Sequence, residues 1–245
     1  MEDYKVLMQK IDRTRVPKHI AVIMDGNGRW AKKRLQNRLY GHKHGAKAVR
    51  QTIEACHELG VEYLTLYAFS TENWRRSDNE VSGLLKLILS TLLGEIDELI
   101  KNNVRVKFIG SQKNLEANYL KKIHLACEKS KSNTGLHVNV AFNYGGRREI
   151  LDAVNELILK AKNGEELPDI VDESYFEEHL YTAGIPDPEL LIRTSGEIRL
   201  SNYLIWQTAY TEFWFTDELW PDFNKSLLVQ AVLDYQKRDR RLGAE

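Results

Sequence analysis

The first residues that could do chemistry lie in a glycine-rich turn at residues 25–28, with the sequence DGNG. An apolar, β-branched run at residues 19–24 predicts a buried strand before the turn, and residues 29–33 can begin a helix after it. Backbone N–H groups of such a turn converge with the helix start on one point, and glycine lets an anion approach closely. Asp25 can hold a divalent cation against that anion, and Arg29 adds a charged donor. The turn matches neither of the two glycine patterns that bind nucleotides with a defined geometry. Its spacing alone therefore favours a plain tight turn and a phosphate site equally.

Three further polar loops follow other predicted strands, at residues 70–76, 143–148 and 193–201. In a parallel sheet, ligands bind outside the carboxyl ends of the strands, so the four loops are expected to converge. Basic residues in or beside them are Arg29, Arg38, His42, Arg76, Arg193 and Arg199. A single surface arginine is usually only solvated, but arginines gathered beside an aspartate and a glycine turn suit diphosphate, whose oxygens match the guanidinium fork. The loops have room for two diphosphates, and the apolar residues around them indicate apolar tails.

The elements that must position these loops alternate along the chain. Strands are predicted at residues 19–24, 63–69, 104–109, 136–142, 190–192 and 212–215. Helices are predicted within residues 1–18 and at 29–33, 45–59, 81–101, 115–130, 149–161, 173–180, 203–209 and 225–240, with a polar loop at 36–44. This alternation predicts one α/β domain over residues 1–245, with a central, mostly parallel sheet covered by helices on both faces. Residues 1–17 are expected to form an N-terminal helix or arm, and residues 241–245 a mobile tail.

Composition narrows the class of protein. The 245 residues include 35 Lys and Arg against 35 Asp and Glu, so the net charge is zero and nucleic acid is not an expected partner. The two cysteines, Cys56 and Cys127, form no metal pattern and favour a reducing compartment. The polar start and the lack of a long apolar run predict no signal peptide and no membrane span. We therefore expect a cytoplasmic protein.

Several separated blocks together resemble the cis-prenyltransferases. The blocks are MDGNGRWAKK at 24–33, GHKHGA at 41–46, LTLYAFSTENWRR at 64–76, NVAFNYGGRREI at 139–150, the segment 190–223 and the closing RDRRLG. The resemblance runs from about Pro17 to Gly243, with the motifs in the family's order, and the DDxxD motif of the trans-type synthases is absent. It implies a Mg²⁺-dependent homodimer that elongates farnesyl diphosphate with isopentenyl diphosphate, adding cis double bonds. The implied product is a long polyprenyl diphosphate such as undecaprenyl diphosphate, a lipid-carrier precursor for cell-wall synthesis. Such a product partitions to the membrane, which implies a peripheral place at the inner membrane surface.

The resemblance also implies roles for individual residues. Asp25 matches the family's essential aspartate, which works with Mg²⁺, and Glu212 matches a second metal ligand. Asn73 matches an asparagine assigned to proton removal, although an amide orients a substrate more readily than it acts as a base. The allylic diphosphate site is matched by Gly26, Asn27, Gly28, Arg29, Trp30, Arg38 and His42. Its neighbours in the second loop are Ser70, Thr71, Glu72, Trp74 and Arg76, and the isopentenyl diphosphate site is matched by Arg193, Arg199, Leu200 and Ser201.

Two positions depart from the family pattern, and three further features of the sequence lead to separate predictions. Ile198 stands where members often have His, and Ser77 where a Pro commonly follows the Arg. The segment 241–243 resembles a family tail that reaches the partner's active site, while residues 212–220 and the helices near them are expected to supply the main dimer interface. Leu136 is expected near the floor of a tunnel that limits product length.

Alternatives stay open for the helix at 81–101 and for the protein itself. The helix has a wide apolar face, formed by Leu84, Leu85, Ile88, Leu92, Ile96 and Leu99. Most apolar helix faces of this kind belong to the ordinary hydrophobic core. Only the family resemblance makes this face the wall of an apolar tunnel for the prenyl chain. The chain could also be a non-catalytic subunit that supports a partner, or a general phosphate-ester hydrolase. Retention of Asp25, Asn73 and Arg193 argues against the first, and the lack of a Ser/His/Asp set or His-rich cluster argues against the second.

Overall fold

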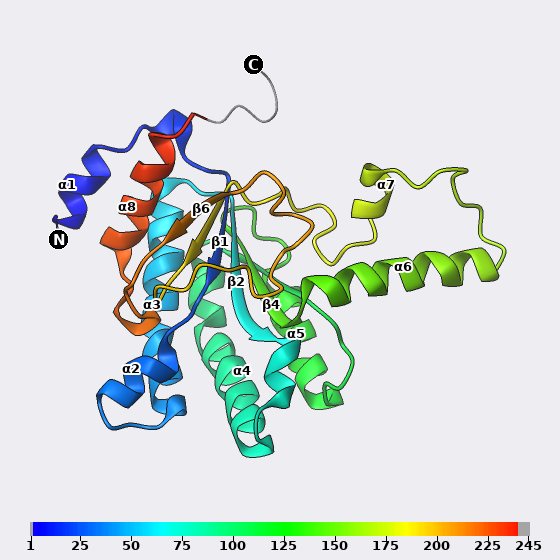
Figure 1. Cartoon of the computed structure of the whole chain (residues 1–245), viewed down its shortest axis with the longest axis horizontal. Helices are drawn as coiled ribbons and strands as arrows, with labels where there is room; N and C mark the ends of the chain where they lie inside the picture. The colour runs from blue at the N-terminus through cyan, green and yellow to red at the C-terminus, as the bar shows by residue number, and fades with distance from the viewer. Residues whose placement is uncertain (1, 240–245) are drawn as a thin grey trace.

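A computed structural model describes residues 2–239, so the predicted tail at 241–245 lies outside the described residues. Its centre is a six-stranded sheet with the order β3-β4-β2-β1-β5-β6, seen at the middle of Figure 1. The strands are β1 (His19–Ile23), β2 (Tyr63–Ser70), β3 (Arg105–Ile109), β4 (His137–Tyr144), β5 (Leu190–Arg193) and β6 (Glu212–Phe215). Every neighbouring pair is parallel. The predicted α/β fold is confirmed, and all carboxyl ends lie at one edge of the sheet.

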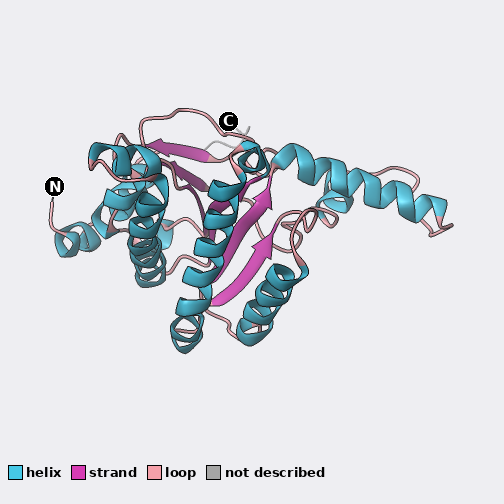
Figure 2. Cartoon of the chain, turned by 90° about the horizontal axis from the view of Figure 1, so that it is seen from below, coloured by secondary structure: helices cyan, strands magenta, loops and turns pink. Residues whose placement is uncertain are grey.

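The helices and short 3₁₀ segments complete the chain. The α-helices are α1 (Tyr4–Gln9), α2 (Asn27–Lys33), α3 (Arg38–Leu59), α4 (Asp78–Lys101), α5 (Ala117–Ser130), α6 (Gly146–Lys162), α7 (Glu173–Glu177) and α8 (Lys225–Gln236). The 3₁₀ segments are η1 (Arg13–Arg15), η2 (Thr71–Arg75) and η3 (Trp220–Asp222). Helix α6 projects away from the sheet in both whole-chain views (Figures 1 and 2). Within residues 2–239, no helix combines the length and the apolar character needed to cross a membrane.

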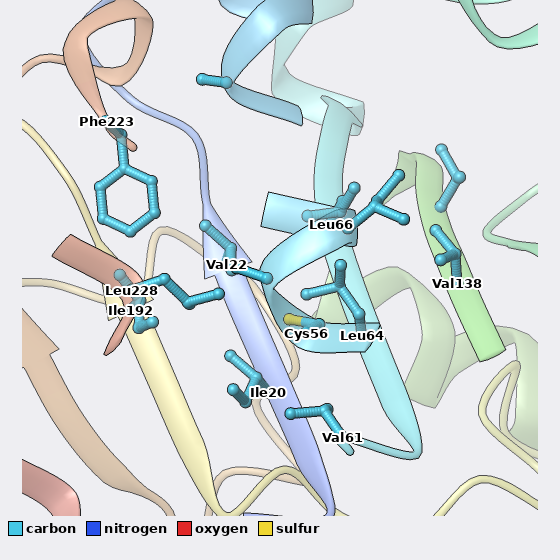
Figure 3. Packing of buried hydrophobic residues seen from close by; sticks show 14 of the residues in the cluster. Ile20, Val22, Cys56, Val61, Leu64, Leu66, Val138, Ile192, Phe223 and Leu228 are labelled. Atoms are coloured by element: carbon cyan, nitrogen blue, oxygen red, sulfur yellow. The ribbon is translucent and has the colours of Figure 1, made fainter. Parts of the chain in front are cut away.

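The two faces of the sheet bury different clusters because successive strand residues point to opposite sides. Ile20 and Val22 of β1 face the larger cluster, which includes residues of α3, α4, α5 and α8. Figure 3 shows Cys56 of α3 and Leu228 of α8 packed toward this face. Ala21 and Ile23 face a smaller cluster rich in tyrosine, formed with residues from 181–204. Each large apolar side chain buried here contributes about 1.5–3 kcal/mol.

Two local predictions are wrong. Residues 36–44 were expected to form a loop, but α3 already begins at Arg38, because the Asn37 side chain accepts a hydrogen bond from the Tyr40 N–H and caps it. Residues 203–209 were expected to form a helix and instead form turns. Positive φ angles at Ser201, Asn202 and Leu204 (50°, 62° and 45°) turn the backbone out of the right-handed helical region.

Candidate active site

The turn after β1 places the Asp25 carboxylate at the carboxyl edge of the sheet. Gly26 has φ +105°, and a Cβ there would lie 2.9 Å from a Leu219 methyl, so both the conformation and the space require glycine. Asp25 Oδ1 accepts the Gly26 N–H at 2.6 Å, and Oδ2 accepts from Arg193 Nη2 at 3.0 Å. Burial raises the pKa of Asp25, but these hydrogen bonds and the charges of Arg193 and Arg29 hold the pKa below its usual range. The carboxylate is therefore ionised at neutral pH.

Arg193 is the buried cation of the site. It ends β5, and its side chain is only 4% exposed. Besides Asp25, its guanidinium donates to Ser201 Oγ at 2.7 Å and to the Arg199 carbonyl. Its Nε is buried and has no hydrogen-bond partner among the described residues. A cation held this way is fixed in orientation, and an anion beside it would offset the unpaired donor.

Arg29 and Arg199 flank the site on its more exposed side. Arg29, in α2, reaches the loop after β5, where it donates to the Ser195 carbonyl at 2.9 Å and to Glu197 Oε1 at 3.0 Å. It also lies 3.3 Å from Asp25 Oδ2. Arg199 pairs with the other oxygen of Glu197. Glu197 therefore couples the two arginines in the structure.

The loop after β2 contributes amide and hydroxyl groups. Ser70 and Asn73 form a reciprocal capping box at the start of η2. Asn73 Oδ1 accepts the Ser70 N–H at 3.1 Å, so the side-chain oxygen is already engaged and the amide NH₂ remains for donation. Asn73 is thus arranged as a donor rather than as a base.

His42, Arg38 and Arg76 approach the same place from α3 and η2. Arg38 and Arg76 both contact Glu80 Oε1, at 3.3 and 3.0 Å. Burial, with the charges of Arg76 and Arg38, lowers the pKa of His42 to about 4 although Glu80 opposes this. His42 is therefore neutral at pH 7 and can offer one N–H donor.

Most of the predicted residues line one polar cavity of about 730 Å³ at the carboxyl ends of β1 and β2. Those that do are Asp25, Gly26, Asn27, Gly28, Arg29, Arg38, His42, Ser70, Asn73, Arg76, Arg193 and Ser201. Lining residues that the sequence interpretation missed include Lys32, Gln36, Asn37 and Tyr67. A signal in the sequence could have found part of this lining. The segment between Asp25 and Glu54 contains eight Lys and Arg and no acidic residue.

Other predicted residues do not line this cavity. Trp30 donates from Nε1 to Asp222 at 2.8 Å, with the Arg34 guanidinium 3.7 Å from its ring centroid. Trp74 packs against the main core and donates to Asn143 Oδ1 at 2.7 Å. Thr71, Glu72, Arg199 and Leu200 lie in the surrounding loops without lining it.

Glu212 lies at the other end of the sheet from Asp25. It opens β6 and is level with Leu190, whereas Asp25 follows β1 beyond the level of Arg193. Its carboxylate pairs with Arg238 at 2.6 Å. A single chain therefore does not bring the two predicted metal ligands together, and residues 2–239 contain no cluster of three or more His, Cys, Asp or Glu suited to a metal.

An apolar cavity of about 390 Å³ adjoins the polar one. It lies between α3 and α4 above β2 and β4, which lie side by side in Figure 1. Its apolar lining includes Ala46, Val49, Ile53, Leu66, Leu84, Leu87, Ile88, Leu99, Val138 and Val140. Met24, Asn27, His42, Tyr67, Ala68 and Leu84 line both cavities. The apolar face of α4 therefore serves partly as cavity wall (Leu84, Ile88, Leu99) and partly as core (Leu85, Ile96).

Comparisons with known proteins agree with this arrangement. The sequence model of a prenyltransferase family described as putative undecaprenyl diphosphate synthase matches residues 23–243. The chain is 52% identical over 233 residues to a (2E,6E)-farnesyl-diphosphate-specific ditrans,polycis-undecaprenyl-diphosphate synthase of Micrococcus luteus, covering 95% of this chain and 94% of that protein.

Two solved structures are similar as well. Lavandulyl diphosphate synthase from Lavandula x intermedia, in complex with dimethylallyl diphosphate, has a TM-score of 0.90 at 36% identity, covering 94% of this chain and 99% of that one. A probable undecaprenyl diphosphate synthase of Campylobacter jejuni has a TM-score of 0.77 at 33% identity, covering 93% and 98%. The likeness in each case extends over nearly the whole of both chains.

Proposed function

The chain belongs to the prenyltransferase family described as putative undecaprenyl diphosphate synthase, and from this premise we propose how its residues perform the reaction. The protein is a transferase that elongates a prenyl chain with cis double bonds. We infer that it extends farnesyl diphosphate by successive additions of isopentenyl diphosphate, and that undecaprenyl diphosphate is the product.

The observation that carries this proposal is the pair of adjoining cavities. A polar cavity with buried Arg193 suits a diphosphate, whose oxygens match the guanidinium fork. The apolar cavity between α3 and α4 suits a hydrocarbon chain. Because six residues line both cavities, one amphiphilic molecule can place its head in the first and its tail in the second. A hydrolase of small phosphate esters would have no use for the apolar cavity.

The polar cavity can stabilise the negative charge that develops in the reaction. Breaking the allylic C–O bond leaves positive charge on the prenyl carbon and negative charge on the departing diphosphate. Arg29, Arg193 and the backbone N–H groups at the start of α2 lie at the cavity and stabilise that negative charge. Where one such donor has been removed from an enzyme, the loss is about 2.7–4 kcal/mol.

After the new carbon–carbon bond forms, the isopentenyl unit must lose a proton. Asn73 is a poor base because a carboxamide has little basicity, and its side-chain oxygen already accepts the Ser70 N–H. We assign to Asn73 the orientation of the incoming diphosphate through its amide N–H groups. In this proposal the proton passes to an oxygen of the departing diphosphate, which leaves with it.

The residues present fit a magnesium ion at one point. Mg²⁺ prefers oxygen ligands and is commonly held by one or two carboxylates together with substrate phosphates and water. Asp25 is ionised, its side chain is 32% exposed, and it lies in the cavity assigned to diphosphate. When bound there, the ion would supply positive charge that neutralises the leaving group. Glu212 of the same chain cannot share that ion with Asp25, since the two lie at opposite ends of the sheet.

We further propose a homodimer that covers α6. Leu151, Val154, Ile158 and Leu159 are 38–58% exposed along this projecting helix, which extends beyond the sheet in Figure 2. An exposed apolar stripe of this kind is typical of an association surface. The predicted interface at 212–220 needs revision at one end, since Trp220 is 1% exposed and donates to the Gly45 carbonyl at 3.0 Å.

The proposal is tested with the purified chain alone, farnesyl diphosphate, labelled isopentenyl diphosphate and Mg²⁺, followed by extraction and chromatography of the lipid. A long cis product supports it. Absence of turnover supports a non-catalytic subunit, and free phosphate without elongation supports a hydrolase. Asp25→Ala is expected to abolish elongation in a protein that still folds, with a lower free energy of unfolding in urea because the buried Arg193 guanidinium loses its carboxylate partner. Near-normal elongation by this variant would contradict the site assignment.

A further inference from the structure

An ion pair spans the rim of the apolar cavity. Arg50 of α3 donates to Glu95 of α4 and lies 3.5 Å from Glu98, one turn further along the same helix. All three residues line the cavity, together with the apolar side chains beneath them. Since α3 and α4 form the two side walls, this contact joins one wall to the other.

The two walls are held very differently by the rest of the molecule. Helix α3 is anchored to α8, because Lys225 Nζ lies 2.7 Å from Glu54 and 2.8 Å from Glu58. Helix α4 has one described ion pair to α5, between Asp97 and Lys129, and neither of these residues lines a cavity. Arg38 of α3 also pairs with Glu80 of α4, but at the diphosphate end, so Arg50 is the charged link between the two walls at the apolar cavity.

The position of the Arg50–Glu95 ion pair along the apolar cavity determines which part of a bound prenyl chain it can affect. His42 lies at the diphosphate end of α3, and Arg50 follows eight residues later, about 12 Å along the helix axis. The head of a prenyl diphosphate therefore lies before the link, and the hydrocarbon tail reaches it. Once the 390 Å³ between the helices is filled, each further five-carbon unit requires α3 and α4 to separate.

We propose that Arg50, with Glu95 and Glu98, is a specificity-determining clamp that resists this separation and so limits product length. This inference rests on the proposed function, because it assigns the growing chain to the apolar cavity. The clamp touches neither the diphosphate cavity nor the reacting atoms. It therefore acts on when elongation stops and leaves the first condensation unaffected.

The variant that tests the clamp is Arg50→Gln. We expect longer products, with the ratio of the next-longer chain to the wild-type main product rising about two- to fivefold, the range that an exposed ion pair supports. The rate of the first condensation, measured in a single turnover with farnesyl diphosphate, should stay at the wild-type value. Lys129→Gln is the matched control, because it removes an ion pair to the same helix away from the cavity. It should leave the distribution unchanged.

Charge-reversal variants and added salt test the clamp without relying on the folding of a single variant. Glu95→Arg alone places like charges opposite each other and should lengthen the products further. Combining Arg50→Glu with Glu95→Arg restores an attractive pair and should return the distribution toward wild type. Exposed ion pairs are screened at high ionic strength, so wild type in 1 M KCl should approach the Arg50→Gln distribution, while Arg50→Gln should respond little.

Each outcome separates the clamp from the function on which it rests. If wild type forms no elongated lipid, the proposed function fails. If wild type elongates and Arg50→Gln makes the same chain lengths, or the reversed pair does not rescue, the clamp is refuted while the function stands. A salt response of equal size in wild type and Arg50→Gln would assign that response to other charges and would also refute it.

Discussion

Replacing Arg193 by lysine tests whether one buried guanidinium organises the diphosphate cavity. The arginine contacts Asp25 Oδ2 at 3.0 Å and Ser201 Oγ at 2.7 Å from different nitrogens of the same planar group. Lysine keeps the charge but offers one compact ammonium in place of a fork, so it cannot hold both partners in this geometry. We expect kcat for elongation to fall about 10²–10³-fold, as when one preorganised donor is lost from a site of developing negative charge. The folded protein should remain, because Asp25 keeps Arg29 at 3.3 Å.

The assay is steady-state incorporation of labelled isopentenyl diphosphate, with urea unfolding measured on the same preparations. We expect the free energy of unfolding to fall by about 1–3 kcal/mol, the cost of leaving one buried polar group poorly paired. Arg148→Lys is the matched control, since Arg148 also forms a two-point contact with a carboxylate, Asp152, but lies outside the cavity. A folded Arg193→Lys protein with kcat/KM close to wild type would refute the reasoning, because the fork would then be dispensable.

Three further results are expected. Burial holds the pKa of His19 at about 4, below its value of about 6.5 in unfolded chains, so stability should be full above pH 6.5 and fall by up to about 3 kcal/mol as the pH drops to 4. Urea unfolding at several pH values should show that the free energy of unfolding falls less steeply with decreasing pH in His19→Gln than in wild type. An equally steep fall in the two proteins would contradict this. Leu136, just before β4, is buried without lining a cavity, whereas Val138 of β4 lines the apolar one, so Leu136→Ala and Val138→Ala should both lengthen the lipid product. Unchanged chain lengths in both variants would place the floor elsewhere, and unfolding must be followed because Leu→Ala in a core costs about 2–5 kcal/mol. Leu159→Glu should convert the proposed dimer to a monomer in light scattering, and a persistent dimer would exclude the exposed stripe of α6 as the interface.

The strands were the most predictable part of the fold, for a physical reason. Buried parallel strands are continuous apolar runs, and residues 19–24 and 63–69 stand out between polar loops. The alternation of strands and helices then required parallel pairing, which brought the loops after β1, β2 and β5 to one edge of the sheet. Asp25 and Arg193 were found in this way and Asn73 through the family resemblance, and all three line one cavity.

The errors arose where long-range contacts decide local structure. The start of α3 is polar and glycine-containing, and resembles a loop in isolation. Its glycines are needed because a Cβ at Gly41 would lie 2.0 Å from the Asn27 carbonyl oxygen, and at Gly45 2.4 Å from the Asn27 side chain. The turns at 203–209 have the opposite cause, since their composition suits a helix but a side chain ties the segment to the sheet, where the Tyr203 hydroxyl donates to the Thr65 carbonyl at 3.0 Å. Neither contact can be predicted from a short stretch of sequence, because each joins residues that are distant in the chain.

Those glycines also determine how the two cavities communicate. They let α3 pack directly against the turn that carries Asp25, so the first part of α3, with Arg38 and His42, faces the diphosphate cavity. The same rigid helix continues along the apolar cavity with Val49 and Ile53. Because α3 is anchored to α8 through Lys225, separation of the walls moves α4 and leaves Arg38 and His42 in place. The resistance of the two helices to separation, rather than a change at the diphosphate site, is thus the physical route by which a filled cavity can end elongation.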